Sequence, residues 1–94
     1  MSIRFQWDPQ KAARNATKHS VTFLEAATVL QDPLAFIFDD EEHSDEEHRE
    51  IITGHSKRSR LLVVLFTERD DVIRVISARR ADREEREDYE EARR

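Results

Sequence analysis

The sequence predicts an α+β fold with two short N-terminal helices, a mainly antiparallel sheet of four to five strands and a charged C-terminal helix. Three observations predict it: helical periodicity in the first third, aliphatic and β-branched runs in the middle, and a Glu/Arg-rich end. The 94 residues suit one domain, 1–94, with no room for a second core.

The N-terminal third contains two helix starts. Residues 4–7 alternate as in a strand, and Asp8-Pro9 then places an N-cap before a proline at the first helical position, so we expect a helix through His19. Thr22 and Glu25 have capping-box spacing, in which each side chain satisfies a backbone N–H, and we expect a second helix there. The sequence Asp32-Pro33 ends it.

The middle of the chain is rich in strand-forming residues. Aspartates between the last two runs favour a hairpin, because aspartate tolerates left-handed backbone conformations. The predicted strands cover 34–38, 49–53, 61–67 and 72–78.

Charge is segregated along the chain. The formal net charge is −5, but residues 39–50 hold eight of the 21 acidic residues and one of the 16 basic residues. The remainder, with 15 basic and 13 acidic residues, can therefore present a local basic face. The acidic run is interpreted as a solvated loop, with repulsion of RNA or docking on a basic partner as alternatives. The chain has no cysteine and no long apolar stretch, so we expect a cytoplasmic protein without membrane contact.

The C-terminal segment repeats the capping-box spacing at Asp82 and Glu85. If this helix extends back through Arg79, basic side chains form one stripe and acidic ones the opposite face, which favours a ligand face. A solvated helix held by i,i+4 pairs is the alternative. The stripe consists of Arg79, Arg83, Arg86 and Arg93.

Arginines cluster near the last two predicted strands. Arg74 lies in mid-strand with Val72 and Ile76 on one face, while Arg79 is expected on the other. Arg74 either pairs with Glu68 across the hairpin or opens onto a polar groove, where its planar fork suits phosphate oxygens. No histidine pair has metal-ligand spacing, and the sequence has neither a nucleophile elbow nor a glycine-rich phosphate loop. We therefore expect no metal and no cofactor.

The order of local patterns resembles the BrnT toxins over nearly the whole chain. The resemblance rests on Phe5-x-Trp7-Asp8, Asn15-x-x-Lys18-His19, Thr67-Glu68-Arg69, Ile73-Arg74-x-Ile76-Ser77-Ala78-Arg79 and a tyrosine, Tyr89, in the final helix. Two positions depart from the family pattern: Ser20 follows Lys-His where glycine is usual, and the hairpin turns through Arg69-Asp70-Asp71 where Arg-Gly-Asp is usual. Both positions are therefore expected to be shifted or mildly strained.

The resemblance implies a RelE-like ribonuclease that inhibits translation as the toxin of a type II toxin-antitoxin pair. It also implies that a DNA-binding antitoxin, BrnA, neutralises the toxin by forming a hetero-oligomer with it. Operator DNA is then contacted only by the antitoxin. Metal-independent RNA cleavage needs a proton acceptor, a proton donor and cations, since the ribose 2'-hydroxyl attacks the neighbouring phosphate. The predicted catalytic residues are Arg79, Arg69, Arg74, Glu68 and His19, and the predicted RNA-binding residues are Lys18, Arg83, Arg86 and Tyr89.

Two other functions remain open from the sequence. A non-catalytic module could dock on a protein through its charged helix and acidic loop. Direct DNA binding is disfavoured by the acidic balance and by the lack of a helix-turn-helix or zinc pattern.

Overall fold

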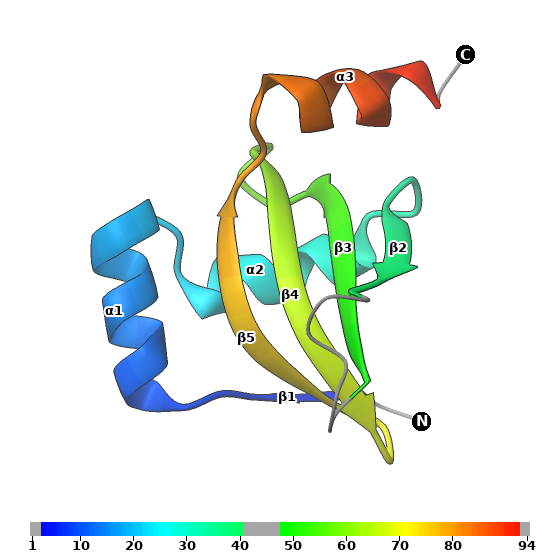
Figure 1. Ribbon diagram of the computed structural model, residues 1–94. Helices are drawn as coiled ribbons and strands as arrows, with labels where there is room; N and C mark the ends of the chain where they lie inside the picture. Colours follow the sequence, from blue (N-terminus) through cyan, green and yellow to red (C-terminus); the bar gives the residue numbers. More distant parts are fainter. Residues whose placement is uncertain (1–2, 41–47, 93–94) are drawn as a thin grey trace.

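The computed structural model describes residues 3–40 and 48–92, in which five strands form one sheet with the order β1-β5-β4-β3-β2 (Figure 1). The short strand β1 pairs with β5 in parallel, and the other neighbours are antiparallel. This confirms the predicted α+β class. The strands are β1 (Arg4–Gln6), β2 (Phe36–Asp39), β3 (Arg49–His55), β4 (Leu61–Arg69) and β5 (Val72–Arg80); the helices are α1 (Pro9–His19), α2 (Phe23–Thr28), the 3-10 turn η1 (Val29–Gln31) and α3 (Arg83–Glu91).

The two N-terminal helices cover one face of the sheet. Val21, Phe23, Ala26 and Val29 pack on apolar residues of the central strands to form a continuous core. The helices start where the caps predict, since Asp8 accepts a hydrogen bond from the Gln10 N–H at 2.9 Å. None of the described helices is long and apolar enough to cross a membrane.

The predicted capping box of α2 is confirmed for the Thr22 side chain and wrong for the Glu25 side chain. The Thr22 hydroxyl accepts from the Glu25 N–H at 3.1 Å, as expected. The Glu25 carboxylate, however, turns inward to the guanidinium of Arg60 and accepts from the Ser56 hydroxyl at 2.7 Å. A charged partner outcompetes the N-cap N–H, because hydrogen bonds between two ionised groups are stronger than those to a neutral amide.

Helix α1 lies along the edge of β5 above the point where β1 ends. The buried Asn15 side chain accepts from the Ala78 N–H at 3.1 Å and donates to the Ala78 carbonyl at 2.8 Å. Beyond the three residues that pair with β1, β5 thereby has its outward backbone groups at Ala78 satisfied by a side-chain amide rather than by another strand.

A β-bulge in β5 corrects the predicted placement of two arginines. Ser77 pairs with Leu65 and Val75 with Phe66, so Ile76 is an extra residue that shifts the alternation. Arg74 and Arg79 therefore share one face of the sheet, opposite α1 and α2, instead of lying on opposite faces. We call this the open face.

The hairpin between β4 and β5 turns through two residues rather than four. Asp70 and Asp71 have φ of 52° and 64°, the left-handed pair that a tight hairpin needs and that aspartate tolerates. The turn also binds β1, because the Asp71 carbonyl accepts from the Arg4 N–H at 3.0 Å. The departure from the family pattern thus keeps the conformation that glycine would adopt.

Ser20 ends α1 in the left-handed conformation, with φ 58° and ψ 33°. Because a left-handed L-residue costs about 1 kcal/mol or more, Ser20→Gly is expected to raise the free energy of unfolding by about 0.5 to 1 kcal/mol. Thr17→Gly, at an exposed position within the same helix, should instead lower it by about 1 kcal/mol. Urea unfolding of both variants measures the difference, and equal destabilisation would contradict a strained cap.

Candidate functional site

The open face carries an arginine-lined cleft at the hairpin end of the sheet. The cleft has a volume of about 600 Å³, and we call it the arginine cleft. Its lining side chains come from β1, the residue before β3, β4, the β4–β5 turn and β5: Arg4, Gln6, His48, Thr67, Glu68, Arg69, Asp70, Val72 and Arg74. Two of the predicted catalytic arginines and the predicted Glu68 therefore lie together.

Arg69 and Arg74 are exposed and available to a ligand. In the described part of the chain, no carboxylate lies within ion-pair distance of either guanidinium. Of the two alternatives for Arg74, the ion pair with Glu68 is not made among the described residues, although both residues line the cleft. The polar-groove alternative for Arg74 agrees with this geometry.

Arg4 and Gln6 are cleft residues that the predicted site omits. They pair with Val72 and Arg74, so β1 lies beside the cation-bearing part of β5. The signal was present in the sequence, because alternation in residues 4–7 sets Arg4 and Gln6 opposite Phe5 and Trp7, which pack on the core.

Arg79 does not line the arginine cleft. It lies five residues beyond Arg74, about 15 Å along the strand, at the end of the sheet nearest α3. Its guanidinium makes two parallel hydrogen bonds to Glu85, of 2.7 and 2.8 Å. The Glu85 carboxylate raises the pKa of Arg79, and Arg79 in turn lowers the pKa of Glu85. The three predicted arginines thus share a face but do not surround one phosphate.

His19 is the last residue of α1 and does not line the arginine cleft. It is half-buried, one helical turn beyond Asn15, which bonds to the backbone of Ala78. The end of α1 reaches the level of the end of β5 (Figure 1). Lys18, by contrast, lines a separate concavity on α1 with Ala13, Arg14 and Thr17.

The predicted helical stripe of arginines is wrong at its start, because α3 begins at Arg83 and Arg79 belongs to β5. Arg83 is exposed and pairs with Glu87 at 3.2 Å, and Arg86 is exposed. Arg93, the last predicted member, lies outside the described residues. The capping box of Asp82 and Glu85 is confirmed.

Tyr89 is a docking residue for α3. It is 5 % exposed, its ring packs edge-on against Phe36 and His55, and its hydroxyl donates to Asp32 at 2.9 Å. Burial would raise the pKa of Asp32, but hydrogen bonds from the His55 and Leu34 N–H groups and from Tyr89 outweigh it and lower the pKa. In this position the Tyr89 ring is covered and does not face the open solvent.

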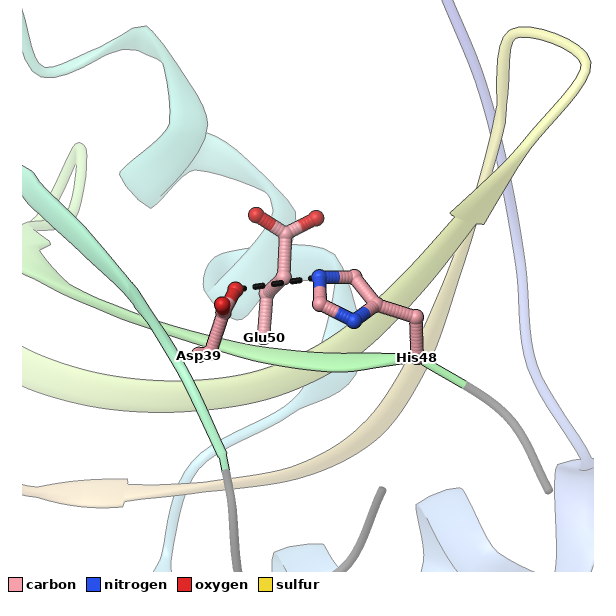
Figure 2. Close-up of side chains that lie close together, drawn as sticks. All are labelled: Asp39, His48 and Glu50. Carbon is pink, nitrogen blue, oxygen red and sulfur yellow. Dashed lines mark ion pairs between the residues drawn. The ribbon is translucent and has the colours of Figure 1, made fainter. Parts of the chain in front are cut away.

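One group of described side chains has the composition of a metal site. Asp39, His48 and Glu50 each offer a ligand atom, and these atoms lie within 4.8 Å of one another (Figure 2). The imidazole of His48 points at Asp39, with its Nε2 3.0 Å from the carboxylate. Histidine with two carboxylates suits a divalent transition ion, but Asp39 and His48 are exposed to water. His43, in the same acidic run, lies outside the described residues.

A small α+β domain with a cationic, partly open sheet face is suited to binding a nucleic-acid backbone. A family model described as "Ribonuclease toxin, BrnT, of type II toxin-antitoxin system" matches residues 7–85, and the chain therefore belongs to the BrnT family of ribonuclease toxins. Membership of a type II toxin-antitoxin family implies an antitoxin partner.

The fold is similar to a solved structure of the same family. The crystal structure of the Brucella abortus ribonuclease toxin BrnT, at 1.1 Å resolution, has a TM-score of 0.67 and 22 % sequence identity. The match covers 87 % of this chain and 100 % of that chain. No curated protein sequence matches this chain.

Proposed function

We propose that this chain cleaves RNA without a metal ion, by attack of a ribose 2'-hydroxyl on the adjacent phosphate, and thereby inhibits translation. The observation that carries the proposal is the pair of exposed guanidiniums, Arg69 and Arg74, in a cleft on the open face of a BrnT-family chain. Because no carboxylate of the described residues pairs with them, both guanidiniums keep their planar donor edges for phosphate oxygens.

The proposal divides the work between two places on β5. The arginine cleft binds phosphates of the strand, while Arg79, about 15 Å away, stabilises the charge that develops at the reacting phosphate. His19 is then the proton-transfer group, because it shares the Arg79 end of the sheet whereas Glu68 lies in the cleft. Glu68 therefore contributes to the shape and charge of the cleft rather than to the chemical step.

The remaining predicted RNA contacts are secondary in this arrangement. The exposed Arg83 and Arg86 of α3 add two RNA contacts in this proposal, but Arg83 pairs with Glu87 and the six carboxylates of the helix repel the RNA backbone. Lys18 extends the cationic surface along α1, next to His19. Tyr89 holds α3 in place through Asp32 and does not stack on a base.

The decisive experiment incubates the purified protein with a labelled single-stranded RNA in EDTA and analyses the fragment ends. We expect cleavage with 2',3'-cyclic phosphate ends, and no cleavage at a position whose 2'-hydroxyl is replaced by hydrogen. Intact RNA would overturn the proposal and favour a non-catalytic docking module. Loss of cleavage in EDTA, restored by a divalent ion, would instead favour a metal reaction involving Asp39, His48 and Glu50.

Arg74→Ala is expected to weaken RNA binding and to lower its salt dependence. One lost contact to single-stranded RNA reduces the slope of log K against log salt by about 0.7. Filter binding at several salt concentrations measures this slope. Lys57→Ala, which removes an exposed cation outside the cleft, is the matched control and should leave the slope unchanged. An unaltered slope in Arg74→Ala would remove this residue from the RNA site.

The cognate antitoxin is proposed to be a BrnA-like, DNA-binding protein that forms a hetero-oligomer with this chain in the cytoplasm. Operator DNA is contacted by the antitoxin in this proposal, because this chain has an acidic net charge and neither a helix-turn-helix nor a zinc pattern. Co-expression with the neighbouring reading frame, followed by mass measurement of the complex, tests the pairing.

A further inference from the structure

The ion pair between Arg79 and Glu85 leaves part of the arginine free. A guanidinium has five N–H donors, and within the described residues three are used. Nη1 donates to Glu85 Oε1 at 2.7 Å and to the Arg80 carbonyl at 3.3 Å, and Nη2 donates to Glu85 Oε2 at 2.8 Å. The two remaining donors, Nε–H and the second Nη2–H, lie side by side on the other edge of the planar group. They form one complete two-donor fork.

The Arg79 side chain is partly exposed to solvent. Its exposed fraction is 43 %, and it lies on the open face with Arg74. A phosphate can therefore approach the free edge in the plane of the guanidinium while Glu85 stays bound on the other edge.

Glu85 is held by more than the arginine. Its Oε1 accepts from the Asp82 N–H at 2.9 Å, and the Glu85 N–H donates to Asp82 at 2.8 Å, so the carboxylate is part of the cap of α3. The helix itself is docked by Tyr89, whose hydroxyl donates to Asp32 at 2.9 Å. The carboxylate is thus a fixed point against which the long Arg79 side chain is oriented.

We infer that Glu85 is the positioning residue of the site: it fixes the guanidinium plane of Arg79 so that the free Nε/Nη2 edge faces the reacting phosphate. The inference rests on the proposed RNA cleavage. Fixing the fork before the reaction removes the entropy cost of ordering Arg79 in the transition state. Glu85 therefore contributes to turnover rather than to RNA binding, since its own negative charge opposes the RNA.

The test is Glu85→Gln, which preserves the cap. The glutamine side-chain oxygen can accept from the Asp82 N–H as glutamate does. Its NH2 group, however, faces an N–H of Arg79, so one of the two hydrogen bonds to Arg79 is lost. We expect kcat to fall about tenfold, within the range for groups that orient a reactive centre, and the RNA Kd to stay equal or decrease. Glu84→Gln removes the same charge at an exposed position of the same turn and should leave kcat unchanged.

A double variant separates positioning from general structural effects. In the Arg79→Ala background, Glu85→Gln should reduce kcat no further, because the group it orients is gone. If Glu85→Gln unfolds at the assay temperature, Arg79→Lys replaces it: lysine keeps the charge but has no fork, and the same loss of kcat is expected.

Two outcomes would overturn the inference. Unchanged kcat in folded Glu85→Gln would show that the orientation of Arg79 does not matter, and increased kcat would show that Glu85 masks the arginine. Both differ from failure of the proposed function, in which the wild-type protein itself leaves RNA intact.

Discussion

Arg79→Ala lowers the rate of RNA cleavage by about two to three orders of magnitude, equivalent to about 3 to 4 kcal/mol of transition-state stabilisation. This is the expected result because Arg79 lies on the open face and keeps a two-donor fork that no described residue occupies. The loss should appear in kcat, since the arginine cleft, which contains the RNA-binding Arg69 and Arg74, is unchanged.

Arg80→Ala is the matched control for this variant. Arg80 is exposed and adjacent, but strand alternation sets its side chain on the opposite face of β5. Its carbonyl, which accepts from Arg79, is retained in the alanine variant. Single-turnover cleavage of a reporter RNA in EDTA compares the two, and equal rates for Arg79→Ala and Arg80→Ala would remove Arg79 from the reaction.

Arg60→Ala is expected to lower the free energy of unfolding by about 3 kcal/mol, the largest stability change predicted for this chain. The Glu25 and Arg60 side chains are 5 % and 19 % exposed, so removing the cation leaves a buried carboxylate that keeps its hydrogen bond from the Ser56 hydroxyl and has only the exposed Arg58 as a nearby described cation. Arg58→Ala removes a cation 3.7 Å from the same carboxylate that is 73 % exposed, and should change stability by less than about 0.5 kcal/mol. Urea unfolding at pH 7 measures both, and equal effects would contradict a buried pair.

The same ion pair makes the stability pH-dependent. Hydrogen bonding from Arg60 lowers the pKa of Glu25 below its ordinary value of 4.5, against the opposing effect of burial. Since the folded state binds this proton less readily than the unfolded state, the stabilisation is complete above pH 4.5 and is lost as the pH falls through the lowered pKa. Arg60→Ala should lose this component of the acid denaturation profile.

The elements of the fold were predictable because their signals are local. Asp8-Pro9, Thr22 and the Asp82/Glu85 box mark helix starts within four residues of sequence, and β-branched runs mark the strands. The bulge at Ile76 had no such signal. It depends on how β5 is packed against β4, and it decided which face carries Arg79.

The candidate site was predictable in composition but not in arrangement. Arg69, Arg74 and Glu68 adjoin one hairpin, so their common cleft follows from short-range geometry. The partners of Arg79 and Glu25 were not predicted, because a carboxylate six residues away and an arginine 35 residues away compete with closer local pairings. The RelE-like relationship and the roles of the individual site residues stay predictions.

The Asn15 amide has a consequence for how copies of this protein behave in a crowded cell. A bare strand edge invites other chains to extend the sheet, and β5 would present one beyond β1. With β1 on its first three residues and Asn15 clamped on Ala78, that border of the sheet offers no template for aggregation at either place.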